Sequence, residues 1–174
     1  AILIYDGDSL MSNDTPDLIC EGAANNDLLG SVIAIGDVDN DSANEIVVAG
    51  LGGGGTGFVQ VFEFGTCTAP TGQFSHASPV SFGTSIAIGN IDNTTMYKEI
   101  IVGDPGASSS AGIVSLWNFN GSTAYTQLGS DFGGAASDGC GSSLASSSGN
   151  GGGSGDVLGD GADDVVVGCA GNSV

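Results

Sequence analysis

Four acidic side chains crowd into nine consecutive residues of this 174-residue chain. Asp37, Asp39, Asp41 and Glu45 occupy positions 1, 3, 5 and 9 of one loop, and Ala43 offers a backbone carbonyl at position 7. Two carboxylates at ~4 Å repel each other by about 4 kcal/mol at an effective dielectric of ~20. Calcium prefers such loops of oxygen ligands. We therefore predict a calcium site here, the alternative being a solvated acidic turn.

The same pattern recurs in a second loop. This copy offers Asn90, Asp92 and Thr94 as oxygen ligands. Lys98 occupies its ninth position, and Glu99 follows one residue later. Two alternatives stay open: the lysine ammonium takes the place of the cation, or Glu99 bulges inward to bind it.

A third copy follows near the end of the sequence. It offers the side chains of Asp156, Asp160 and Asp164 and the backbone carbonyl of Ala162. Leu158 stands at position 3, where the first loop has an acid. Because this leucine removes one ligand, we expect weaker metal binding at the third loop.

Each acidic loop belongs to a longer repeated unit. A glycine turn precedes each loop, at Gly30, Gly83 and Gly141, and a β-branched run follows it. A sequence repeat of roughly 50–60 residues indicates a repeat architecture built from similar structural units. Strand-like segments near the start match the third and fourth strands that the last unit lacks. We therefore divide the chain into units at 29–82, 83–139 and 140–174, the last completed by 1–28.

The residues that flank the loops resemble a known family. Phe82-Gly83 before the second loop and Gly103-Asp104-Pro105 after it are similar to the FG-GAP repeat of integrin α-subunit propellers, and Gly168-Cys169-Ala170 is a looser copy. The resemblance covers nearly the whole chain. It implies an all-β, β-propeller-like fold of four-stranded antiparallel blades. It also implies Ca²⁺ in the hairpin between the first two strands of a blade, an extracellular setting and a role in cell adhesion.

Three blades are too few for a closed propeller, which typically has four to eight. We therefore expect a partial propeller, or one completed by a homo-oligomer in which the end of one copy meets the start of the next. Two chains would give a six-bladed ring, and a non-closing contact would give a filament. We predict a structural or adhesive module that contacts protein partners. The alternatives are a filament or surface-layer subunit and an accessory propeller of a secreted hydrolase.

The charge of the chain excludes several classes of partner. Twenty acidic residues face a single lysine, for a formal net charge of −19. Nucleic acids and anionic lipids attract positive charge, so neither is expected to bind. Cations and basic protein surfaces are the expected partners. The sequence contains no run of 18 apolar residues, so no transmembrane helix is predicted. The chain begins in a strand-like segment without an initiator methionine or signal peptide, so we expect a processed or partial chain.

The four cysteines favour an oxidising compartment. They allow three disulfide pairings. Cys140 stands where the first strand of the third unit begins and Cys169 where the second ends, and these ends are neighbours in an antiparallel hairpin. This pattern favours Cys140–Cys169 and leaves Cys20 with Cys67, although the other pairings stay open. The spacing does not match a metal–thiolate site.

No catalytic constellation stands out. His76 is the only imidazole, and no nucleophile pattern accompanies it. The glycine-rich stretch 52–57 lacks the lysine of a phosphate-binding loop. We therefore predict that the protein is not an enzyme.

Asn13, Asn93 and Asn120 begin sequons for N-glycosylation, which would make the protein a glycoprotein. Chance sequons are common in a chain this rich in Asn, Ser and Thr. Asn93 also lies within the second acidic loop, where a glycan would compete with metal binding.

Overall fold

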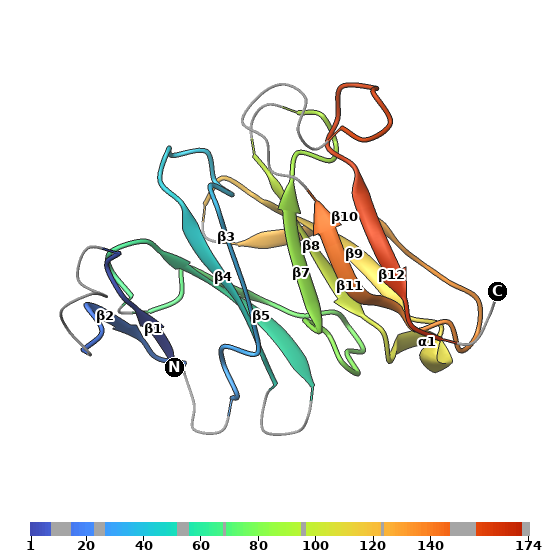
Figure 1. Cartoon of the computed structure of the whole chain (residues 1–174), viewed down its shortest axis with the longest axis horizontal. Helices are drawn as coiled ribbons and strands as arrows, with labels where there is room; N and C mark the ends of the chain where they lie inside the picture. The colour runs from blue at the N-terminus through green and yellow to red at the C-terminus, as the bar shows by residue number, and fades with distance from the viewer. Residues whose placement is uncertain are drawn as a thin grey trace.

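A computed structural model describes residues 1–7, 15–22, 27–51, 56–67, 69–94, 97–122, 124–146 and 156–171. These residues form twelve strands, arranged as four antiparallel sheets, and one short helical turn (Figure 1). The all-β class predicted from the β-branched runs is confirmed. Among the described residues, no helix has the length and hydropathy needed to cross a membrane.

Two of the sheets have four strands each. Sheet I contains β3 (Val32–Gly36), β4 (Glu45–Leu51), β5 (Gly57–Glu63) and β6 (Gly72–Phe74). Sheet II contains β7 (Ser85–Gly89), β8 (Glu99–Asp104), β9 (Ile113–Phe119) and β10 (Tyr125–Gly133), with the turn α1 (Ala107–Ser110) between β8 and β9. Strands that are consecutive in sequence pair in both sheets, as the four-stranded repeat predicts.

The remaining two sheets have two strands each. The N-terminal pair contains β1 (Ile2–Ile4) and β2 (Leu18–Cys20), and the C-terminal pair contains β11 (Cys140–Ser146) and β12 (Val165–Cys169). They lie at opposite ends of the molecule, with sheets I and II between them (Figure 1). They therefore do not share one sheet within a single chain, and completion of one pair by the other would involve two chains.

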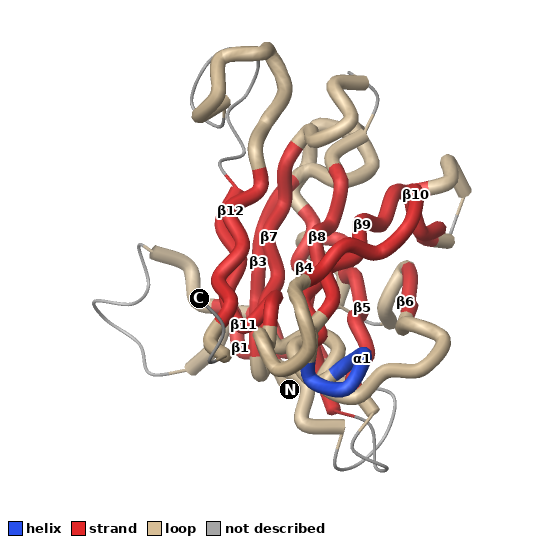
Figure 2. The backbone as a smooth tube through the Cα atoms, turned by 90° about the vertical axis from the view of Figure 1, so that its right-hand side faces the viewer, coloured by secondary structure: helices blue, strands red, loops and turns tan. Residues whose placement is uncertain are grey.

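Three hydrophobic cores join the sheets in chain order. The first core lies between the N-terminal pair and sheet I, the second between sheets I and II, and the third between sheet II and the C-terminal pair. In the second core Phe74 of β6 stacks on Trp117 of β9, with ring centroids 4.6 Å apart. Figure 2 shows the strands β3, β7 and β11 of successive sheets running near one another through the middle of the molecule.

Two disulfides fasten the outer pairs. Cys20 of β2 is bonded to Cys67, which follows β5, so this bond ties the N-terminal pair to sheet I. Cys140 of β11 is bonded to Cys169 of β12. This is the pairing that the repeat pattern favoured.

Candidate metal site

Loop 1, residues 37–45, joins β3 to β4. Gly36 and Glu45 face each other where the two strands end. The Glu45 side chain is completely buried, and its Oε2 accepts a 2.8 Å hydrogen bond from the Val38 amide. Val38 is itself buried in the second core. Packing of this valine therefore draws the loop over the Glu45 carboxylate.

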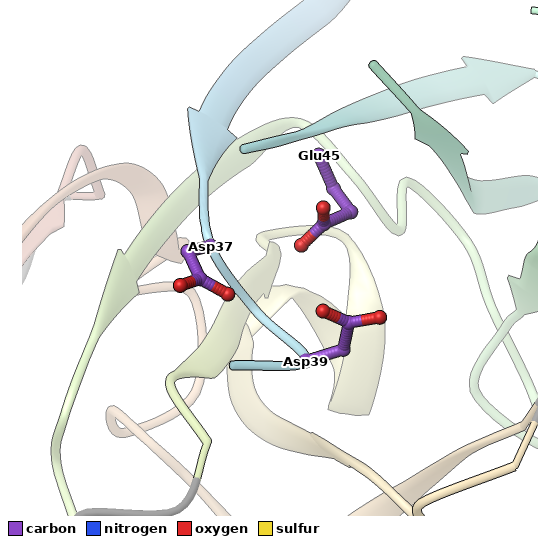
Figure 3. Close-up of side chains that lie close together, drawn as sticks. All are labelled: Asp37, Asp39 and Glu45. Atoms are coloured by element: carbon purple, nitrogen blue, oxygen red, sulfur yellow. The ribbon is translucent and has the colours of Figure 1, made fainter. Parts of the chain in front are cut away.

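Three carboxylates converge in loop 1. Oxygens of Asp37, Asp39 and Glu45 lie within 4.8 Å of one another (Figure 3). Asp37 Oδ1 and Glu45 Oε1 are buried and have no hydrogen-bond partner. A buried oxygen without a partner costs free energy, and native proteins seldom leave one so. The two oxygens are therefore suited to hold a cation.

The other two residues predicted for loop 1 stand apart from this convergence. Asp41 and Ala43 are exposed. Asp41 Oδ1 accepts a 2.7 Å hydrogen bond from the Ala43 amide, and the Asp41 amide donates to Asp39 Oδ1 at 3.2 Å. These bonds shape the turn at the rim of the site.

Loop 1 carries uncompensated negative charge. Burial, opposed by the Val38 hydrogen bond and reinforced by the charges of Asp39 and Glu63, raises the pKa of Glu45 to about 7. Burial and then Asp41 raise the pKa of Asp39. Burial and then Asp39 also raise the pKa of Glu63, which faces Glu45 from β5. Within the described residues, none of these three carboxylates forms a salt bridge. A divalent cation would supply the missing positive charge.

Loop 2 spans 90–99, of which 95 and 96 lie outside the described residues. Glu99 faces Gly89 across the hairpin end, as Glu45 faces Gly36 in loop 1. Glu99 is completely buried, and its Oε2 accepts a 2.7 Å hydrogen bond from the Ile91 amide. Glu99 thus turns inward, as Glu45 does in loop 1.

Loop 2 also holds buried oxygens without partners. Glu99 Oε1 and Asn90 Oδ1 are both of this kind. Burial, and then the charge of Asp92, raise the pKa of Glu99. Asp92 and Thr94 are exposed, and Asp92 Oδ1 accepts the Thr94 amide at 2.9 Å. Asn90 and Glu99 therefore correspond to the unpartnered pair of loop 1.

Loop 3, residues 156–164, is more exposed. Asp164 Oδ2 accepts the amides of Val157 and Leu158 at 2.7 and 2.8 Å. Asp156 accepts the amide of Gly161 at 2.8 Å, and this bond chiefly lowers the pKa of Asp156. Backbone amides thus already satisfy these carboxylates.

The remaining predicted residues of loop 3 repeat the turn geometry of loop 1. Asp160 Oδ1 accepts the amide of Ala162 at 3.1 Å, as Asp41 accepts that of Ala43. Asp160 is exposed. Within the described residues, loop 3 contains no buried unpartnered carboxylate oxygen.

Asp163 links loop 3 to loop 2. Its Oδ2 accepts the Asn90 amide at 2.9 Å, and its own amide donates to the Asn90 carbonyl at 3.0 Å. The loop pattern of the sequence did not single out this residue. Because the two residues are 73 positions apart, no local signal could have paired them.

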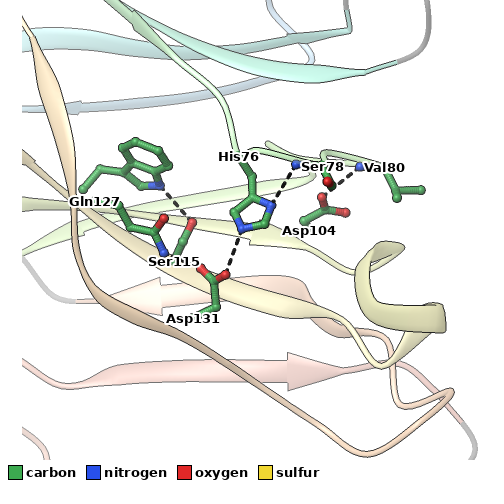
Figure 4. Close-up of polar contacts among 8 residues, drawn as sticks. His76, Ser78, Val80, Asp104, Ser115, Gln127 and Asp131 are labelled. Atoms are coloured by element: carbon green, nitrogen blue, oxygen red, sulfur yellow. Dashed lines mark hydrogen bonds and ion pairs between the residues drawn. The ribbon is translucent and has the colours of Figure 1, made fainter.

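The turn before loop 2 has its own anchor. Asp104, of the Gly-Asp-Pro motif, is completely buried. Its carboxylate accepts the amide of Val80 at 3.0 Å (Figure 4). It also accepts the amide of Ser81 at 2.8 Å. Asp104 therefore holds the turn that leads into Phe82-Gly83.

His76 joins the two four-stranded sheets. Its Nε2 lies 2.8 Å from Oδ2 of Asp131 on β10, and its Nδ1 accepts the Ser78 amide at 3.3 Å (Figure 4). Asp131 also accepts a 2.6 Å hydrogen bond from Gln127. Both ring nitrogens are engaged, so the geometry favours a structural role for this imidazole.

Two of the three predicted glycosylation sites can be placed. Asn93 and Asn120 are exposed. Asn120 Oδ1 accepts the Ser122 amide at 3.1 Å within its turn. Asn13 lies outside the described residues.

Comparison with known proteins finds no family model that matches the chain and no match among curated proteins.

Proposed function

We propose that this chain is a calcium-stabilised, FG-GAP-like repeat module with a structural or adhesive role outside the cell. The observation that supports the metal best is the Glu45 carboxylate. It is completely buried, one of its oxygens has no partner, and it lies beside Asp37 and Asp39. A bound cation would neutralise the repulsion among these carboxylates and satisfy the unpartnered oxygens.

The donor atoms favour calcium over other metals. All candidate ligands in loop 1 are oxygens, which select hard cations such as calcium, magnesium and manganese. Magnesium demands near-ideal octahedral geometry and keeps several waters, whereas calcium accepts irregular sets of protein oxygens. Asn90 and Glu99 would hold a second ion in loop 2. Loop 3 would bind more weakly, because amides already occupy its carboxylates. The metal supplies charge and cross-linking, and we assign it no catalytic step.

The propeller-like arrangement is part of the proposal. In both four-stranded sheets an acidic hairpin joins the first two strands, and each sheet packs on the next along the chain. The resemblance of the loop-flanking residues to FG-GAP repeats supports the same reading. The two disulfides support an oxidising, extracellular setting.

A binding or structural role is favoured over catalysis. His76 has both ring nitrogens engaged by Asp131 and Ser78. The net charge of −19 favours basic protein surfaces as partners.

Thermal unfolding in EGTA and in calcium tests the metal. When free calcium is tenfold above its Kd, binding to the folded state adds about 1.4 kcal/mol. For a chain of this length, that raises Tm by roughly 3–6 °C. Glu45→Gln should raise Tm in EGTA, because it removes a buried charge, and should diminish the calcium response. Glu21→Gln removes the same charge at an exposed position and serves as the matched control.

Two results would contradict the proposal. One is a wild-type melting curve that calcium leaves unchanged, which a solvated acidic turn would give. The other is an equal calcium response in the Glu45 and Glu21 variants.

A further inference from the structure

Large apolar side chains are exposed at both ends of the molecule. Ile33 and Ile35 of β3 are 48% and 60% exposed. Their equivalents in the next repeat, Ile86 and Ile88 of β7, are 9% and 5% exposed. The two strands have almost the same sequence, Val-Ile-Ala-Ile-Gly and Ser-Ile-Ala-Ile-Gly. The difference therefore comes from what covers each strand.

The covered strand shows what β3 lacks. Ile86 and Ile88 are buried in the second core, against which Val32 and Ala34 of β3 pack. A Cβ on Gly36 of β3 would lie only 3.1 Å from the Ile88 side chain, so β3 approaches β7 closely. The strands β3 and β7 thus turn their isoleucines towards the preceding side, and Ala34 and Ala87 towards the following sheet. Within the described part of the chain, no strand covers Ile33 and Ile35 in this way.

The C-terminal pair presents such a small-residue face. Leu144 and Val167 pack into the third core, so their neighbours Ser143, Ala145 and Val166 lie on the opposite face. Those three are exposed, Val166 by 57%. This face corresponds to the side of β3 and β7 that covers the next sheet.

The free sheet edges that β12 and β1 have in the described ranges indicate that these two strands could pair. The second strand of each four-stranded sheet, β4 or β8, bonds to a strand on both sides. In the described residues, β12 bonds only to β11, and β1 only to β2. A free edge is a template for another strand. The N-terminal pair packs over Ile46 and Val48 in the first core, which share the face of Ile33 and Ile35. The space beside β1 therefore lies over the uncovered part of β3.

The outer face of the N-terminal pair is apolar, and an apolar side chain is also exposed on sheet II. Leu3 and Ile19 face away from the first core and are 50% and 49% exposed. Phe132 of β10 is 42% exposed and pairs with Val114, which is buried in the third core. That is the part of sheet II that the C-terminal pair leaves uncovered. The strands β1, β2, β3, β11 and β12 also contain no charged residue, in a chain with 20 acidic ones.

We propose that a second copy of this chain docks head to tail, with its β11–β12 pair against β1 and over β3. The joined strands form a four-stranded sheet in the order β11–β12–β1–β2. The contact covers Ile33 and Ile35 of one copy, and it covers Phe132 of the other with Leu3 and Ile19. Because the two surfaces differ, repeated docking gives a ring or a filament. This contact involves no metal, so the docking and the calcium site can be tested independently.

Light scattering coupled to size-exclusion chromatography tests the proposal with two blocked variants. Ile33→Lys/Ile35→Lys blocks the β3 surface, and Ala145→Lys/Val166→Lys blocks the β12 surface. Lysine lowers the net negative charge, so loss of assembly cannot come from added repulsion. Val80→Lys is the control, because Val80 is 56% exposed and belongs to neither surface. Circular dichroism establishes that each variant is folded.

The expected result is a wild-type and a control that form dimers or larger species with rising concentration. Each blocked variant alone is a monomer. An equimolar mixture of the two forms a one-to-one heterodimer and nothing larger, because each supplies the surface that the other has lost. A wild-type chain that stays monomeric overturns the proposal and points to a different β-sheet as the occupant. Blocked variants that assemble as the wild type does, or a mixture that stays monomeric, overturn it equally.

Discussion

At the residue scale, two buried glutamates define the acidic hairpins. Glu45 and Glu99 are both completely buried, and each accepts an amide from its loop through one oxygen while leaving the other unpartnered. The amide bond fixes the orientation of the carboxylate, and the unpartnered oxygen is then directed at the site. Burying a carboxylate without a counter-charge is costly. A proton or a cation at this carboxylate would therefore stabilise the hairpin.

The pH dependence of metal-free stability follows from Glu45. Its pKa in the folded chain, about 7, lies above the ordinary value of 4.5. Protonation therefore stabilises the fold, fully below pH 4.5, and this contribution is lost as pH rises through about 7. Its upper bound is about 3 kcal/mol. In EGTA, Tm should rise as pH falls from 7.5 to 5, to a smaller extent in Glu45→Gln.

With saturating calcium the slope should reverse, because protons and the metal compete for the same carboxylate. Measuring Tm across this pH range in EGTA and in calcium checks both signs. A wild-type slope in EGTA that equals that of the Glu45 variant would show that this carboxylate does not control the titration.

At the element scale, each outer strand pair depends on a covalent bond. A two-stranded antiparallel unit is marginally stable by itself in water. The Cys20–Cys67 bond ties the N-terminal pair to sheet I across 47 residues of sequence, and Cys140–Cys169 closes the C-terminal hairpin across 29. Each bond thus secures a strand pair that, within the described ranges, has no further strand bonded to it.

Removing either disulfide should expose a different end of the chain. Cys20→Ser/Cys67→Ser should lower stability by about 4 kcal/mol by the loop-closure relation. It should also abolish hydrogen-exchange protection at Ile2–Ile4 first. Cys140→Ser/Cys169→Ser, the matched variant, should cost between about 3 and 4 kcal/mol and expose Val165–Cys169 first. Uniform loss of protection across both ends in either variant would contradict this assignment.

At the scale of the whole molecule, packing between the sheets holds them together in their sequence order. Phe74 of sheet I contacts Trp117 and Tyr125 of sheet II, with ring centroids 4.6 and 5.3 Å away. His76 and Asp131 add a polar contact between the same two sheets. This middle core includes Val38 of loop 1, so the acidic hairpin and the sheet interface share one packed cluster.

Phe74→Ala should weaken the packing between sheets I and II. Deleting a buried phenylalanine ring typically costs about 3–5 kcal/mol. Trp117 is the only tryptophan, so its fluorescence should shift to longer wavelength as the interface opens. Phe64→Ala is the control, because Phe64 is 61% exposed. Equal destabilisation by the two substitutions, or unchanged Trp117 emission in the Phe74 variant, would argue against this interface.

The sequence alone determined the strands and the hairpins. β-Branched runs between glycine turns predicted strands close to those observed, because strand propensity and turn chemistry are local properties. The acidic spacing likewise predicted that Asp37, Asp39 and Glu45 lie close together, because residues of one tight loop are close in sequence. The repeat also favoured the observed cysteine pairing, because it places the ends of one hairpin together.

Only the tertiary structure decided which groups are buried and which distant elements meet. Strand register placed Glu99 opposite Gly89, so it occupies the inward position that counting along loop 2 gave to Lys98. The contact of Asp163 with Asn90 joins two loops of different sheets. The N-terminal and C-terminal pairs lie at opposite ends because sheets I and II pack between them. Burial and contact between distant residues depend on the packing of whole sheets, which no local pattern encodes.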